Sequence, residues 1–171
     1  MTIPAPPRPV PTAGVLRLRP RYGECDPMGV VHHASYLPWL EMGRTELLRD
    51  AGVSYAQLEE QGVFLVIVKV DARYRRPARY DDLLELRTRV VGGSRVKIEH
   101  EYEIDLIERA TGSGADPTPP AGQNILGART VLACVDRAGR PRALPEWVLA
   151  GPGNGRARDR HERGAGASPG G

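Results

Sequence analysis

Five stretches of the chain alternate hydrophobic and polar residues with a period of two, which is typical of strands with one buried face. They cover residues 15–19, 63–73, 83–91, 96–107 and 125–136. Short turn sequences join some of these stretches, notably VGGSR at 91–95, and another turn, DRAGRP at 136–141, follows the last one. Short connections of this kind favour an antiparallel sheet.

One segment, SYLPWLEMGRTELLRDAG at 35–52, follows the helical period instead. The positions that share a face are Tyr36, Trp39, Leu40, Gly43 and Leu47. Ser35 is the predicted N-cap and Gly52 the predicted C-terminal stop. A glycine inside a helix costs about 1 kcal/mol relative to alanine, so Gly43 predicts a close approach between helix and sheet. A short second helix is expected over residues 54–62.

These elements predict one α+β domain over residues 14–149, in which a curved five-stranded antiparallel sheet wraps around one long central helix. Residues 1–13 are rich in proline and residues 150–171 in glycine and arginine, and both are expected to be disordered. Residues 109–123 read as a flexible insertion between two strands.

Charge argues against a nucleic-acid partner. The formal net charge is +3, and residues 150–171 carry four arginines against two acidic residues, or +2, which leaves +1 for the rest. The chain has no apolar run long enough for membrane insertion and no signal-peptide pattern near its start, so a cytoplasmic location is expected. Cys25 and Cys134 are expected to be reduced thiols, and no metal-ligand spacing is present.

The connection before the long helix, ECDPMGVVHHASYL at 24–37, carries the candidate chemistry. A helix N-terminus offers unpaired N–H groups that suit an anion or a polarised carbonyl oxygen. Asp26, which precedes proline, begins a turn, Gly29 allows an unusual backbone angle, and Val31 anchors the loop inside. A carboxylate beside such N–H groups supplies the base or nucleophile and the oxyanion site that acyl transfer needs.

The stretch YGECDPMGVVHHASYLPWLEMGRTELLRDAG resembles the 4-hydroxybenzoyl-CoA thioesterase and YbgC-type acyl-CoA thioesterases of the hotdog fold. YRRPARYDDLLELRTRVVGGSRVKIEHEYEI resembles later blocks of the same family. The resemblance implies that Asp26 attacks the thioester carbonyl or activates water. It also implies that the His33 N–H polarises the thioester oxygen, and that Tyr22 lies beside the catalytic loop. Glu24 and Cys25 stand where YbgC-like members commonly have Asp-Thr.

For the substrate, we expect Gly29, Val31, Arg75 and Arg76 to contribute to binding, with the arginines meeting the phosphates of coenzyme A. Arg73, Arg95 and Lys97 are weaker candidates for the same role. No cofactor is expected. The resemblance implies an active site between subunits, so a dimer is the minimal unit and a homotetramer is expected.

Other residues have competing interpretations. Glu41 on the long helix is the rival carboxylate, although pairing with Arg44 is the favoured interpretation. His32 is interpreted as a neighbour of the site and His100 as a core histidine. The expected activity is acyl-CoA hydrolysis. Its alternatives are a hotdog module that binds acyl-CoA or acyl-carrier protein without catalysis, and a hotdog dehydratase.

Overall fold

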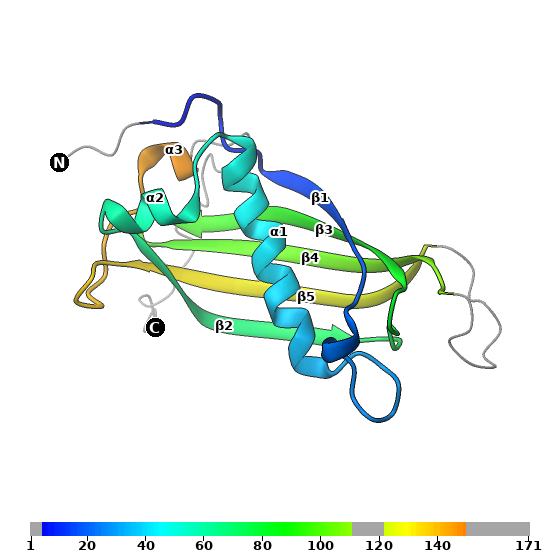
Figure 1. The fold of residues 1–171 in the computed structure, drawn as a ribbon. Helices are drawn as coiled ribbons and strands as arrows, with labels where there is room; N and C mark the ends of the chain where they lie inside the picture. Colours follow the sequence, from blue (N-terminus) through cyan, green and yellow to red (C-terminus); the bar gives the residue numbers. More distant parts are fainter. Residues whose placement is uncertain (1–4, 111–121, 150–171) are drawn as a thin grey trace, which may run out of the picture.

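The computed structural model describes residues 5–110 and 122–149, and it has the α+β architecture that the sequence predicts (Figure 1). The strands are β1 (Ala13–Leu18), β2 (Phe64–Tyr74), β3 (Leu83–Ser94), β4 (Lys97–Glu108) and β5 (Gln123–Val135). The helices are α1 (Tyr36–Asp50), α2 (Tyr55–Glu60) and α3 (Glu146–Leu149). Short 3₁₀ turns η1 (Tyr22–Glu24) and η2 (His33–Ser35) lie between β1 and α1.

The five strands form one sheet in the order β1-β3-β4-β5-β2, with every neighbouring pair antiparallel. Helix α1 crosses one face of this sheet, and its first turn lies near the end of β2 (Figure 1). In this strand order, β1 and β2 are the two edges of the sheet. The predicted insertion at 109–123 joins β4 to β5, and its central part, like the predicted tail at 150–171, lies outside the described residues.

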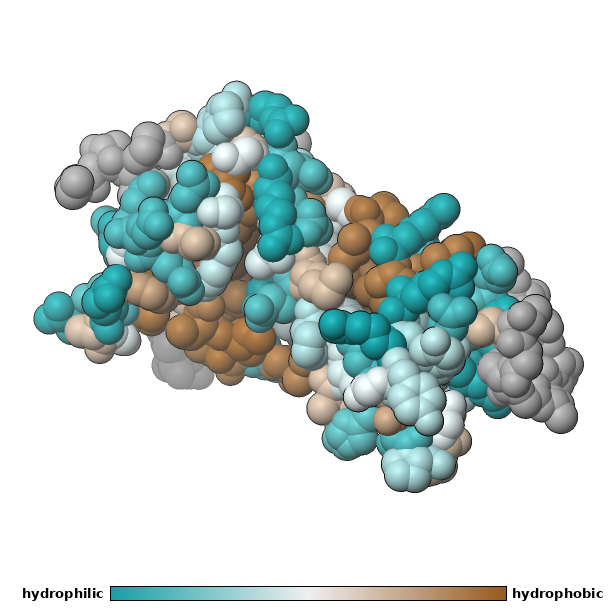
Figure 2. All heavy atoms as spheres, viewed as in Figure 1, coloured by the Kyte–Doolittle hydropathy of each residue, from teal (hydrophilic) through white to brown (hydrophobic). Residues whose placement is uncertain are grey.

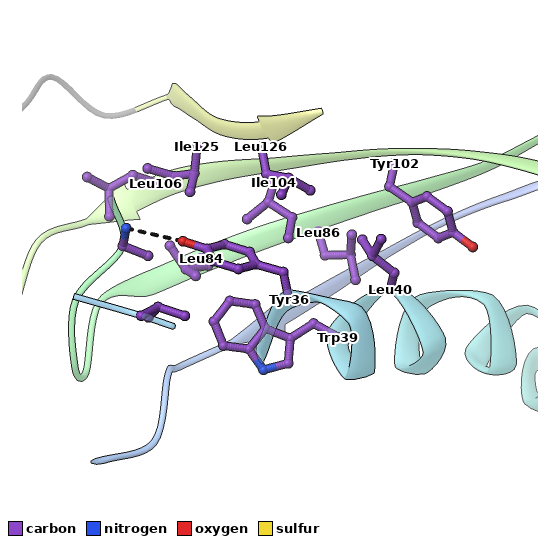
Figure 3. Close-up of a cluster of buried hydrophobic side chains, with 12 residues drawn as sticks. Tyr36, Trp39, Leu40, Leu84, Leu86, Tyr102, Ile104, Leu106, Ile125 and Leu126 are labelled. Carbon is purple, nitrogen blue, oxygen red and sulfur yellow. Dashed lines mark hydrogen bonds between the residues drawn. The ribbon is translucent and has the colours of Figure 1, made fainter. Parts of the chain in front are cut away.

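The hydrophobic core lies between α1 and the sheet. Tyr36, Trp39 and Leu40 of α1 face inward-pointing side chains of β3, β4 and β5 (Figure 3). Those strand residues are Leu84, Leu86, Tyr102, Ile104, Leu106, Ile125 and Leu126. Each fully buried large side chain contributes roughly 1.5–3 kcal/mol relative to an exposed one, so this cluster fixes α1, and the loop before it, against the sheet.

Gly43 lies where α1 comes closest to the sheet, as the sequence predicted. A Cβ atom at this position would overlap Thr88 Oγ1 and would lie 2.8 Å from Leu86 Cδ2. We expect Gly43→Ala to destabilise the protein by about 2 kcal/mol, because overpacking outweighs the roughly 1 kcal/mol gain in helix propensity. Urea unfolding measures the change, and an alanine variant as stable as the wild type would contradict the close contact.

The proline-rich arm differs from its prediction. Val10 is buried in a core cluster with Leu47 and Leu48. The Arg8 N–H donates to the carbonyl of Ala51 at 3.3 Å, and the Thr12 carbonyl accepts from Val90 N at 2.7 Å. Residues 8, 10 and 12 are therefore held by partners at the C-terminal end of α1 and on β3, which a disordered arm would not have.

Ser35 occupies the N-cap position of α1, as predicted, but its side chain makes no capping hydrogen bond. It has helical backbone angles, and its hydroxyl donates to the Glu24 carbonyl at 3.0 Å. The cap belongs instead to the preceding turn η2, where His32 Nδ1 accepts from the Ala34 N–H at 3.3 Å. At the other end, Gly52 has φ +87° just beyond the C-cap Ala51, as expected for a helix stop.

Candidate active site

Asp26 begins a tight turn in the loop between β1 and α1. An isolated β-bridge joins Cys25 to Val31, and within it Asp26 N donates to the Val30 carbonyl at 2.9 Å. The Asp26 carboxylate accepts from Met28 N at 2.8 Å through Oδ1, which leaves Oδ2 outside the loop's own hydrogen bonds. Gly29, with φ +77°, closes the turn in a conformation that favours glycine. The loop thus holds one partly buried carboxylate in a defined place.

Glu24 connects this loop to α1, a role that sequence reasoning missed. Its carboxylate accepts from Trp39 Nε1 at 3.0 Å and from Arg21 N at 2.7 Å. Its carbonyl accepts from His32 N at 2.9 Å and from the Ser35 hydroxyl. These bonds place the loop that carries Asp26 beside the turn that begins the helix.

The Glu24 carboxyl has a lowered pKa. Burial acts to raise it, but the hydrogen bonds from Arg21 N, Trp39 and the Arg21 side chain together outweigh burial. A lowered folded-state pKa means that the carboxylate stabilises the fold above its ordinary value of 4.5 and loses this contribution as the pH falls through the folded value.

We therefore expect Glu24→Gln to lower the free energy of unfolding by about 1 kcal/mol at neutral pH, with a smaller difference in acid. The reason is that glutamine carries no charge at any pH, whereas Glu24 becomes neutral in acid. Urea unfolding from about pH 7 down to about pH 3 measures the gap. A gap of constant size across this range would contradict the role given to the charge.

The turn η2 leaves one backbone donor unused. Across residues 31–35, Val31 N donates to Ala78 O, His32 N to Glu24 O, Ala34 N to His32 Nδ1 and Ser35 N to His32 O. His33 is the first residue of the turn, so its N–H has no acceptor inside the turn. No hydrogen bond of the described residues uses it. A free N–H at the start of a helical segment is suited to a polarised carbonyl oxygen.

Tyr74, at the end of β2, is a second residue that sequence reasoning missed. Its hydroxyl donates to the His33 carbonyl at 3.0 Å, and its ring packs edge to face on Tyr36 at 5.4 Å. The only sequence signal was an aromatic residue at a strand end, which does not specify a partner 41 positions away.

The other predicted site residues lie in different surroundings. The Tyr22 side chain is 82% exposed and packs edge to face on Tyr80, and no hydrogen bond of the described residues joins it to Asp26. Val31 is buried in the core cluster beneath α1, where it anchors the loop as the sequence predicts. Arg75 and Arg76 lie exposed just beyond β2, with both backbone N–H groups directed to the Ile125 carbonyl.

The rival residues have other partners. Glu41 pairs with Arg44 at 2.8 Å, although its own side chain is exposed and not buried. His100 is buried as expected, but its Nδ1 has no partner among the described residues. Burial, together with the Arg44 charge, lowers the pKa of His100 to about 3, so it stays neutral near pH 7.

Over the described ranges 5–110 and 122–149, no group of three or more His, Cys, Asp or Glu side chains is placed to hold a metal ion. Cys25 and Cys134 are free thiols, as predicted. None of the helices in these ranges has the length and apolar character needed to cross a bilayer.

Known proteins are similar to this chain in sequence. The chain is 32% identical over 135 residues to the putative acyl-CoA thioesterase YneP of Bacillus subtilis, covering 76% of this chain and 88% of that protein. It is 31% identical over 134 residues to the acyl-CoA thioester hydrolase YbgC of Escherichia coli, covering 78% and 90% respectively.

Solved structures of thioesterases have a similar fold. The DHNA-CoA thioesterase of Staphylococcus aureus superposes with a TM-score of 0.67 at 25% identity, over 80% of this chain and 86% of that one. The hotdog fold expected from the sequence is thereby confirmed. The family model of the thioesterase-like superfamily matches residues 20–151. The chain belongs to the thioesterase-like superfamily.

Proposed function

We propose that this protein is an acyl-CoA thioesterase, which converts an acyl-CoA and water to a carboxylic acid and coenzyme A. The single observation that carries the proposal is that the Asp26 carboxylate and the unused N–H of His33 belong to one hydrogen-bonded connection, held by the Cys25–Val31 bridge and the bond from His32 N to the Glu24 carbonyl. The names of the relatives, which include an acyl-CoA thioester hydrolase, support the same reaction class.

In the proposed reaction, Asp26 either attacks the thioester carbon or removes a proton from the attacking water. The carbonyl oxygen becomes negative as the new C–O bond forms, and the His33 N–H stabilises it. The C–S bond then breaks and coenzyme A leaves as a thiolate. If water was the nucleophile, this step gives the carboxylic acid directly. If Asp26 was the nucleophile, it gives a mixed anhydride, which water hydrolyses to the carboxylic acid and free Asp26. In both cases the thiolate takes up a proton that comes from the water. Because the Ser35 N–H already donates to the His32 carbonyl, the His32–His33 peptide is polarised toward a stronger donor.

We propose a second copy of the chain as the other wall of the site, joined through the edge strand β2. Its exposed apolar side chains are Val66, Ile67, Val68, Val70 and Tyr74, and Figure 2 shows hydrophobic surface along this side of the sheet. The opposite edge, β1, has six residues against eleven in β2, so it offers a shorter surface for pairing. A dimer through β2 would place the partner next to the loop of Asp26, and a homotetramer remains a prediction.

Coenzyme A phosphates are proposed to meet Arg75 and Arg76. Both side chains are exposed beside the end of β2, and neither has a carboxylate partner among the described residues. One guanidinium group can donate two parallel hydrogen bonds to the oxygens of a phosphate, which suits this role. We also propose a cytoplasmic location, in keeping with the two free thiols.

Thiol release from a panel of benzoyl-type, short-chain and long-chain CoA thioesters tests the proposed function. Equal amounts of free thiol and carboxylic acid from at least one class are the expected result. Binding of these thioesters without thiol release would instead favour a non-catalytic acyl-CoA module. A product that gains or loses water across a carbon–carbon bond while the thioester stays intact would favour the dehydratase.

A further inference from the structure

The backbone on both sides of His33 is held by hydrogen bonds. On its N-terminal side, the His32 carbonyl accepts from Ser35 N at 2.9 Å. On its C-terminal side, Ala34 N donates to His32 Nδ1, and the His33 carbonyl accepts from the Tyr74 hydroxyl. The direction of the free His33 N–H is fixed by these bonds, because the peptide planes that flank its Cα cannot rotate without breaking them.

Tyr74 differs from the other partners in its origin. The bonds from Ser35 and Ala34 arise within the turn itself. Tyr74 belongs to β2, which follows α1 and α2 along the chain. The side chain is held at both ends, because its ring lies on the buried Tyr36 and its hydroxyl lies 3.0 Å from the His33 carbonyl. A short turn with few buried contacts is a low-stability element unless another element restrains it.

We propose that Tyr74 is a positioning residue for the reaction: its hydroxyl fixes the His33 turn so that the His33 N–H points to the developing oxyanion. The inference rests on the proposed function and adds a residue that acts through the turn, without touching substrate. It also connects the site to the edge strand, because Tyr74 lies on the same strand as the exposed apolar residues of β2.

Tyr74→Phe tests the proposal because it removes the hydroxyl and keeps the ring that lies on Tyr36. We expect kcat to fall about tenfold with KM within about twofold of the wild-type value, since a displaced oxyanion donor weakens transition-state binding alone. Affinity for a non-hydrolysable thioether analogue of the substrate should be unchanged. Tyr80→Phe is the matched control, because no hydrogen bond of the described residues uses the Tyr80 hydroxyl, and it should behave as wild type.

Amide hydrogen exchange supplies a readout that does not depend on activity. The Ala34 N–H should exchange about tenfold faster in Tyr74→Phe than in the wild type or in Tyr80→Phe, because the turn is released. Unchanged exchange at Ala34, or unchanged kcat in an enzyme that Asp26→Asn inactivates, would overturn the role of Tyr74. A wild-type protein that cleaves none of the thioesters would reject the proposed function, and the exchange result would still decide whether Tyr74 holds the turn.

Discussion

Asp26→Asn should reduce turnover of acyl-CoA by about a thousandfold while leaving the fold intact. Asparagine has the same shape as aspartate, and its amide oxygen still accepts from the Met28 N–H, so the loop keeps its hydrogen bonds. What disappears is the charged oxygen that attacks carbon or takes the proton from water. Steady-state thiol release measures the loss, and thermal unfolding reports whether the fold is unchanged.

Asp50→Asn is the matched control for this substitution. Asp50 is an exposed aspartate at the last residue of α1, at the opposite end of the helix from the loop of Asp26. This variant should retain wild-type turnover. If Asp26→Asn also turned over at the wild-type rate, the carboxylate would have no part in the reaction, and the candidate site would be wrong.

Val68→Lys should separate the proposed dimer into monomers and abolish most activity. Val68 is 53% exposed and lies at an irregularity in β2, between the paired residues Ile67 and Lys69. A lysine here places a charge in an apolar contact between edge strands, a substitution that we expect to weaken association by about 2 kcal/mol or more, roughly thirtyfold. Sedimentation at several protein concentrations measures the shift.

Val15→Lys provides the comparison on the other edge of the sheet. Val15 is a 64% exposed valine on β1, so the change in side chain is the same and only the edge differs. This variant should remain a dimer with wild-type turnover. Equal dissociation in both variants, or in neither, would contradict an interface through β2.

Most of the architecture could be predicted because its signals are local. Alternation with period two predicted the five strands, and a period near 3.6 predicted α1. Strands β3, β4 and β5 bury alternate residues beneath α1, whereas most side chains of β2 are exposed. Gly43 predicted the close approach of helix and sheet, because a glycine inside a helix is favoured where a side chain would not fit. Asp26 and His33 came from the loop sequence and its resemblance to known enzymes.

The residues that hold the loop could not be predicted, because their partners are distant in sequence. Glu24 reaches Trp39 across 15 positions, and Tyr74 reaches His33 across 41. The burial of Val10 was missed because composition describes only residues 1–13 themselves. It does not reveal the apolar surface near Leu47 against which Val10 packs. Tertiary contacts of this kind leave no periodic signal in the chain.

A structure of the Asp26→Asn variant with a bound acyl-CoA would locate the substrate carbonyl, because substrate persists where hydrolysis is slow. We expect the thioester oxygen to lie about 2.7–3.1 Å from the His33 nitrogen, with the residue 26 side chain facing the carbonyl carbon. A thioester bound away from the η2 turn, with the His33 N–H still open to water, would contradict this expectation.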